Sequence, residues 1–167
     1  MTELGRRATG PGDIYLTGGT TAVLFGWRDS TVDADLKLDP EPSGIFGAIA
    51  WLKDSLDINI ELACPADFIP ELPAWREHSV FIDKRGPVRF FHYDLRAQAL
   101  AKIERGHGRD LSDVRAMFRE GLVDATQLRA AFSAIEPALE RYPALDAEVF
   151  REKLEEILAA IEAEAKP

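Results

Sequence analysis

Two aspartates and a pair of glycines are the residues whose types and spacing could do chemistry together. Asp33 and Asp35 lie two positions apart in a segment that alternates apolar and charged residues, which predicts a strand with both carboxylates on one face. At that spacing their backbones lie about 6–7 Å apart, so both side chains could bind one divalent cation or a pair of cations. Gly18 and Gly19 form a turn between an apolar strand and a short apolar helix that is broken at Gly26. A helix N-terminus that follows a glycine turn suits phosphate oxygens, so this stretch predicts phosphoryl or nucleotidyl chemistry.

The elements that must position these residues follow from the pattern of apolar residues. Strands are predicted over 14–17 and 32–38, the second with Val32 and Leu36 on its buried face, followed by a helix over 45–56, a strand over 57–62 and a hairpin of two strands over 79–83 and 88–92. From residue 95 onward the pattern is helical, with helices predicted over 95–105, 111–120, 128–142 (bent or divided at Pro137) and 146–165. The sequence therefore predicts an α+β protein in which an α/β core over residues 1–94 precedes a helical region over residues 95–167, both packed as one unit.

Glu61 is the candidate for a third carboxylate. The segment over 57–62 alternates strictly, with Ile58, Ile60 and Leu62 on one side and Asn59 and Glu61 on the other. If this strand neighbours the strand of Asp33 and Asp35, Glu61 completes a metal-binding set. The alternative is an ordinary exposed strand residue, and the sequence leaves both open.

Composition and charge limit the class of protein. The chain has 167 residues, 46% of them hydrophobic, which is enough for a real core. With one cysteine, Cys64, no secretory leader at the N-terminus and no apolar run of membrane-spanning length, we expect a cytoplasmic protein that does not insert into a membrane.

The net charge of −9 argues against a protein that binds nucleic acid over its whole surface, but the charge is uneven. The segment from Lys84 to Arg119 has nine basic and four acidic side chains, a net charge of +5. Such a region could attract a nucleotide or a limited stretch of RNA. It could equally be a set of solvated helix faces.

Several common sites are excluded by their missing residues. The chain has no Gly-x-x-x-x-Gly-Lys-Ser/Thr phosphate loop, no third glycine after Gly18-Gly19 for a dinucleotide fingerprint and no Gly-x-Ser-x-Gly elbow. The three histidines are far from one another and from Cys64 in the sequence, which argues against a zinc site.

The remaining motifs resemble those of a known superfamily. Gly18-Gly19 precedes the run Arg-Asp-Ser-Thr-Val-Asp-Ala-Asp from Arg28 to Asp35, and downstream a helix with Lys102 precedes Arg-Asp-x-x-Asp from Arg109 to Asp113. This combination resembles the nucleotidyltransferase (polymerase-beta-like) superfamily, and within it the branch of AbiEii-type toxins and minimal nucleotidyltransferases. The matched pieces span most of residues 14 to 114, with one extra residue between Arg28 and the Ser-Thr pair.

The resemblance implies a role for each matched residue. Asp33 and Asp35, with Glu61 from strand alternation, would hold Mg²⁺ or Mn²⁺, and Lys102 would neutralise the charge of the leaving triphosphate. Nucleotide binding would fall to residues of the glycine turn, the following loop and the helical motif: Gly18, Gly19, Thr20, Thr21, Arg28, Asp110 and Asp113. The residues themselves allow plainer interpretations, in which Thr20 or Thr21 caps the first helix, Lys102 faces solvent, and Asp110 and Asp113 form an N-cap and capping box.

The implied fold is a nucleotidyltransferase fold with a mixed sheet covered by helices and a C-terminal helical segment. The implied activity is metal-dependent transfer of a nucleoside monophosphate from an NTP to an acceptor hydroxyl on RNA or protein. The resemblance also suggests the toxin of a type IV toxin–antitoxin system with a cognate antitoxin protein. Two alternatives stay open: a non-catalytic antitoxin-like or regulatory interaction protein, and a metal-dependent phosphoesterase built on the same acids.

Overall fold

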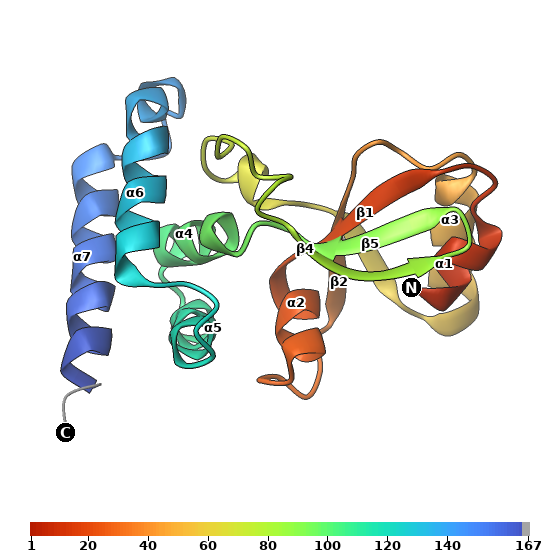
Figure 1. The fold of residues 1–167 in the computed structure, drawn as a ribbon, viewed down its shortest axis with the longest axis horizontal. Helices are drawn as coiled ribbons and strands as arrows, with labels where there is room; N and C mark the ends of the chain where they lie inside the picture. Colours follow the sequence, from red (N-terminus) through yellow and green to blue (C-terminus); the bar gives the residue numbers. More distant parts are fainter. Residues whose placement is uncertain (165–167) are drawn as a thin grey trace. The chain divides into compact units, whose positions relative to one another are not determined.

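Five strands form a mixed sheet in the order β3-β2-β1-β5-β4 in the computed structural model, which describes residues 1–164 (Figure 1). The strands are β1 (Gly12–Leu16), β2 (Asp33–Leu38), β3 (Asn59–Leu62), β4 (Val80–Arg85) and β5 (Val88–His92). β1 runs parallel to β5 and β2 parallel to β3, whereas the β1–β2 and β4–β5 pairs are antiparallel. The predicted α+β class with a mixed sheet and helices is confirmed.

Helices α1 (Thr2–Arg7) and α3 (Ile45–Leu56) bury their apolar side chains against one face of this sheet. The sheet contributes alternate residues of its strands to the shared core: Ile14, Leu16, Leu36, Ile60, Val88 and Phe90. Because successive strand residues point to opposite faces, Tyr15, Asp35 and Phe91 lie on the other face.

Helix α2 (Gly18–Phe25) connects β1 to the segment before β2, and a glycine marks each of its ends. Gly18 begins the helix with φ +60°, and Gly26 ends it in the left-handed conformation with φ +89°. Residues with an L side chain rarely adopt either φ angle. The predicted turn at Gly18 and the predicted helix break at Gly26 therefore both depend on the conformational freedom of glycine.

The helical part is built around α4 (Leu95–Arg105), which contacts four other elements and buries most of its residues. Its neighbours are η1 (Pro65–Asp67), α5 (Gly108–Arg119), α6 (Ala125–Ile135) and α7 (Ala147–Glu164). The chain leaves α6 for a 3-10 turn, η2 (Glu136–Arg141), at the predicted Pro137, because proline cannot donate the next helical hydrogen bond. The predicted helix end at Ala165 lies outside the described residues.

Contacts divide the chain into two compact units, each made of two chain segments. The sheet unit comprises Met1–Cys64 and Arg76–Asp94, and the helical unit comprises Pro65–Trp75 and the chain from Leu95 onward. Pro65–Trp75 therefore belongs with the helices, although it lies between two strands in the sequence. No described helix is long and apolar enough to cross a membrane.

Three local predictions were wrong. Val32 is 82% exposed because β2 begins one residue later, so it packs on no core. Strand β3 begins at Asn59, two residues after its predicted start, so Ile58 lies before the strand and is 39% exposed, and of the predicted apolar side only Ile60 joins the core. Helix α5 starts at Gly108, three residues before its predicted start, and this changes the interpretation of Asp110.

Candidate functional site

The sheet unit brings three predicted carboxylates together on one face. Asp35 on β2 lies directly opposite Glu61 on β3, and Asp33 lies opposite Asn59. Neighbouring strands are about 4.8 Å apart, so Glu61 occupies the place at which strand alternation put the third carboxylate. Asp33 and Asp35 are half-buried and Glu61 is exposed.

The amide of Asn59 joins this cluster. Its Nδ2 donates to Asp33 Oδ1 at 2.6 Å and to Glu61 Oε1 at 2.9 Å. One neutral donor thus bridges two carboxylates that would otherwise repel each other. The sequence placed Asn59 on the face of Glu61 but assigned it no role, because alternation does not reveal a hydrogen bond across strands.

The glycine turn lies against the same cluster. A Cβ on Gly18 would lie 2.4 Å from Asp35 Oδ2, so the carboxylate occupies the space that a side chain would need. A Cβ on Gly19 would lie 2.2 Å from Thr31 Oγ1 and 3.5 Å from Arg28 Nη1. The turn, Asp35 and Arg28 therefore meet at the start of α2, where the helix dipole favours negative charge.

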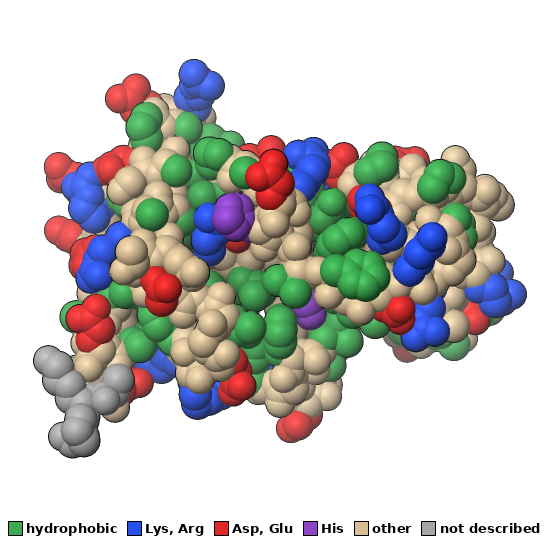
Figure 2. Space-filling view, viewed as in Figure 1, with side chains coloured by type: hydrophobic (Ala, Val, Ile, Leu, Met, Phe, Trp, Pro, Cys, Tyr) green, Lys and Arg blue, Asp and Glu red, His purple; other side chains and the backbone are tan. Residues whose placement is uncertain are grey.

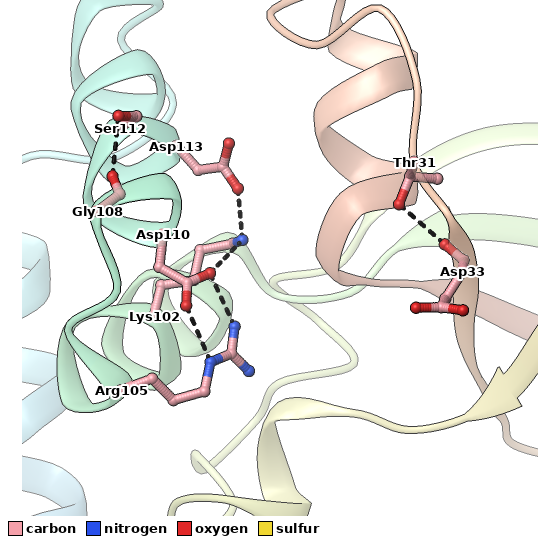
Figure 3. Close-up of polar contacts among 8 residues, drawn as sticks. All are labelled: Thr31, Asp33, Lys102, Arg105, Gly108, Asp110, Ser112 and Asp113. Carbon is pink, nitrogen blue, oxygen red and sulfur yellow. Dashed lines mark hydrogen bonds and ion pairs between the residues drawn. The ribbon is translucent and has the colours of Figure 1, made fainter.

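The loop between α2 and β2 is shaped by a local hydrogen bond. The hydroxyl of Thr31 donates to the backbone carbonyl of Asp33 at 3.1 Å, as Figure 3 shows. This bond bends the chain just before β2 and holds the Thr31 side chain beside Gly19.

The threonines after the glycine turn do not cap the helix as one interpretation predicted. The N-cap position belongs to Thr17, whose hydroxyl donates instead to the carbonyl of Ala63 at 3.3 Å. Thr21 is fully buried and donates to the carbonyl of Leu16 at 3.1 Å. The Thr20 hydroxyl is buried and has no hydrogen-bond partner among the described residues. Of the two threonines, therefore, Thr20 is the one whose hydroxyl is available to a ligand.

The helical unit contains the other predicted residues, in a buried ion network. Lys102 Nζ lies 2.5 Å from Asp113 Oδ2 and 3.3 Å from Asp110 Oδ1 (Figure 3). Arg105 adds two hydrogen bonds to Asp110, from Nε at 3.1 Å and from Nη2 at 3.0 Å. The Lys102 side chain is 4% exposed and that of Asp113 is 3% exposed, so the alternative interpretation of Lys102 as a solvent-facing lysine is wrong.

The alternative interpretation of Asp110 and Asp113 as an N-cap and capping box is also wrong. The N-cap of α5 is His107, which leaves Asp110 and Asp113 inside the helix, one turn apart and both directed at Lys102 of α4. Burial by itself would raise the pKa of Asp110, but the hydrogen bonds from Arg105 and the charge of Lys102 outweigh burial and lower it.

The donor chemistry in the sheet unit fits a hard divalent cation, since carboxylate oxygens are what Mg²⁺ and Mn²⁺ prefer. As the side chains lie, however, no group of three or more His, Cys, Asp or Glu residues within residues 1–164 is placed so that it could hold a metal ion. The two units each hold their own share of the predicted residues: Asp33, Asp35, Glu61, Gly18, Gly19 and Arg28 in the first, and Lys102, Asp110 and Asp113 in the second.

Comparison with known proteins adds no identification. No family model matches the chain, and searches of curated proteins and of solved structures found no match.

Proposed function

We propose that the protein is a metal-dependent nucleotidyltransferase that moves a nucleoside monophosphate from an NTP to an acceptor hydroxyl. One observation supports this most: the register of β2 and β3 sets Glu61 opposite Asp35, beside a glycine turn that is closed by the Asp35 carboxylate. A carboxylate cluster beside a glycine turn at a helix N-terminus suits phosphoryl transfer, because its catalysis is mostly positioning and charge neutralisation.

In the proposed reaction the acceptor hydroxyl loses its proton to water and its oxygen attacks the α-phosphorus. The bond from that phosphorus to the bridging oxygen breaks, and pyrophosphate leaves with the electron pair. Asp33, Asp35 and Glu61 would hold Mg²⁺ or Mn²⁺, which when bound neutralises phosphate charge and lowers the pKa of the attacking hydroxyl. Backbone amides at Gly18 and Gly19, with the Arg28 guanidinium, would bind the phosphates.

The second unit has a supporting part in this proposal. Lys102 is enclosed by Asp110 and Asp113, so its charge is already compensated. Its predicted role at the leaving triphosphate requires those ion pairs to open, and that role stays a prediction. The cytoplasmic location, the cognate antitoxin and the toxin role also stay proposals at the level of the resemblance.

The enclosed lysine favours one alternative function. A protein that binds nucleotide without transferring it needs the turn and the acids but no free cation for a leaving group. The ion network around Lys102 is what such a non-catalytic, antitoxin-like or regulatory relative would keep for stability alone.

One assay distinguishes a protein that transfers nucleotide from one that only binds it. The wild-type protein is incubated with α-labelled NTP, Mg²⁺ or Mn²⁺ and RNA or protein acceptors, beside a variant with Asp33→Ala and Asp35→Ala. A transferase incorporates label in the wild type and not in the variant. A matched control with Glu41→Ala and Glu77→Ala, two exposed carboxylates of the same unit, should retain incorporation. If the wild type binds no NTP in the presence of either metal, the proposal is wrong.

A further inference from the structure

The side-chain amide of Asn59 lies between two carboxylates of the candidate site. Its Nδ2 donates to Asp33 Oδ1 at 2.6 Å and to Glu61 Oε1 at 2.9 Å, so both hydrogens of the NH₂ group are in use. The first bond crosses from β3 to β2, where Asn59 is paired with Asp33. The second joins two residues of β3 whose side chains point to the same face. One amide thus connects the acids of the two strands.

The orientation of this amide follows from the chemistry of its partners. Ionised carboxylates only accept hydrogen bonds, so the NH₂ group must face Asp33 and Glu61 when nothing else lies between them. Turned over, the amide would set its carbonyl oxygen Oδ1 against two negatively charged groups. A cation that bridged Asp33 Oδ1 and Glu61 Oε1 would reverse this preference, because a hard cation binds oxygen and repels N–H groups. Asn59 therefore cannot keep both hydrogen bonds when such a cation binds.

The NH₂ group occupies the place of a bridging cation. A Mg²⁺ ion lies about 2.1 Å from each of its oxygen ligands, so an ion shared by Asp33 Oδ1 and Glu61 Oε1 would take up the space into which the two N–H groups now point. This arrangement is consistent with the finding that, within residues 1–164, no three potential ligands are placed to hold a metal ion. The carboxylates have suitable chemistry, but a neutral donor already holds two of them.

We propose that Asn59 is a positioning residue that competes with the metal ion. In the metal-free protein its amide holds Asp33 and Glu61 together across the two strands, and a divalent cation must displace the amide before it binds both. The amide therefore sets the metal affinity below that of the carboxylates alone. This inference rests on the proposed function, because the cation is the one that the proposed reaction requires.

Two other roles of Asn59 predict different results. If the amide turned over and bound the cation through Oδ1, its removal would weaken metal binding. If Asn59 were an ordinary strand residue, its removal would leave metal binding unchanged. Competition alone predicts that removal of the amide strengthens metal binding, because only the metal-free protein loses hydrogen bonds. The sign of the change therefore distinguishes the three roles.

The first test is calorimetric titration of Mn²⁺ into the full chain without NTP. Asn59→Ala should bind Mn²⁺ about fivefold more tightly than the wild type, the change expected when the metal-free state loses hydrogen bonds to one half-buried and one exposed carboxylate. Equal or weaker binding by Asn59→Ala overturns the proposal, and so does a wild type that binds no Mn²⁺.

The second test observes the amide directly. Asn59 is the only asparagine of the chain, so incorporation of ¹⁵N-asparagine labels one side-chain NH₂ group for nuclear magnetic resonance. At a saturating concentration of Mg²⁺ both proton signals should move towards the positions of a solvated amide, because the bonds to Asp33 and Glu61 are broken. Signals that Mg²⁺ leaves in place would show that the amide is not displaced, against the proposal. This test uses the wild type and so does not depend on the folding of a variant.

Binding of cations elsewhere on the chain has to be separated from binding at this cluster. The net charge is −9, and Figure 2 shows acidic side chains spread over the visible surface. The variant with Asp33→Ala and Asp35→Ala should lose the Mg²⁺-dependent shift of the Asn59 signals. The control with Glu41→Ala and Glu77→Ala should keep it. A shift that persists without Asp33 and Asp35 would mean that the cation binds elsewhere, and would overturn the proposal.

Failure of this inference and failure of the proposed function give different results. A wild type in which Mg²⁺ displaces the Asn59 amide, but which transfers no nucleotide, contradicts the proposed function alone. A wild type that transfers nucleotide, while Asn59→Ala binds Mn²⁺ no more tightly than the wild type does, overturns the role of Asn59 alone.

Discussion

The buried charge of Lys102 depends on two partner carboxylates. Its ammonium has left water almost completely and is compensated by two carboxylates from the next helix. A buried pair contributes little net stability compared with apolar residues of the same shape, but removing one partner leaves a charge buried and unpaired. The network therefore makes α4 and α5 sensitive to the loss of a single side chain.

Replacing Lys102 should destabilise the protein far more than replacing an exposed ion pair. We expect Lys102→Met to lower the free energy of unfolding by about 3–5 kcal/mol, because Asp110 and Asp113 lose their shared cation. The measurement is urea denaturation followed by circular dichroism. Arg129→Ala is the control: its pair with Glu155 is about half exposed on both sides and should contribute about 1 kcal/mol or less. Equal losses for the two variants would contradict this view of the network.

His92 gives the sheet unit a pH dependence. The ring stacks on Phe25 with centroids 4.3 Å apart, its Nδ1 lies 3.4 Å from Thr21 Oγ1, and burial lowers its pKa from 6.5 to about 4. Between those values the unfolded chain binds a proton that the folded chain does not. Stability should therefore be highest above pH 6.5 and fall as the pH drops towards 4, by up to about 3 kcal/mol from this group.

The variant His92→Phe keeps a ring beside Phe25 and removes the titrating group. Its unfolding free energy should fall less than that of the wild type between pH 6.5 and pH 4, as measured by urea titrations at several pH values. The exposed His78, changed to Asn, should leave the wild-type slope intact. The same slope in His92→Phe and in the wild type would show that other groups cause the loss.

At the scale of elements, helix α2 connects backbone conformation with the site. Its two terminal glycines both have positive φ, but their surroundings differ. Gly18 faces Asp35 Oδ2, whereas nothing lies within 4 Å of a Cβ placed on Gly26. Gly18 and Gly26 therefore share a positive φ but differ in what a side chain at each position would contact.

Alanine at either position should cost about 1–2 kcal/mol in stability, because both variants force an L side chain into the left-handed region. Gly18→Ala should in addition displace the Asp35 carboxylate and weaken metal-dependent NTP binding at least tenfold, whereas Gly26→Ala should not. Thermal unfolding measures the first effect and calorimetric titration with NTP the second. If both variants lost NTP binding equally, displacement of Asp35 would not be the cause, and the prediction would be wrong.

At the scale of the whole molecule, the two units are interleaved along the chain. Pro65–Trp75 leaves the sheet unit after β3 and belongs to the helical unit, where η1 contacts α4 and Phe68 lies under Arg105 at 5.1 Å. Ile69 and Leu72 in this segment are 1% and 3% exposed. A boundary drawn between residues 94 and 95 would separate the segment from its helices.

A fragment of residues 1–94 should therefore expose apolar surface and be poorly soluble. We expect it to bind the dye ANS strongly, because its Pro65–Trp75 segment lacks the helices against which Ile69 and Leu72 pack. Replacing Pro65–Trp75 in the fragment by a Gly-Ser linker should remove most of that fluorescence. Equal dye binding by both fragments would mean that the exposed apolar surface lies elsewhere.

Local patterns in the sequence were sufficient to predict most of the elements, although not helix α1. Alternation predicted β2 and β3, helical spacing predicted α3 and α4 with the bounds that they have, and Pro137 and Gly26 predicted where helices end. These predictions succeed because period, glycine and proline act within a few residues. The predicted face of Glu61 is of the same kind, since it depends only on the pleat of one strand.

Contacts between distant segments were decided by the tertiary structure alone. The register that sets Asp35 opposite Glu61 and the Asn59 bridge both depend on which strands pair, and no local pattern in the sequence predicts that pairing. The sequence assigned Lys102 and Asp110 to the nucleotide and left a solvated lysine and a helix cap as alternatives, and it could not reveal the ion pair between them, because it did not show that α5 starts at Gly108 and faces α4. Burial and charge pairing are properties of packed elements, so they appear only once those elements are assembled.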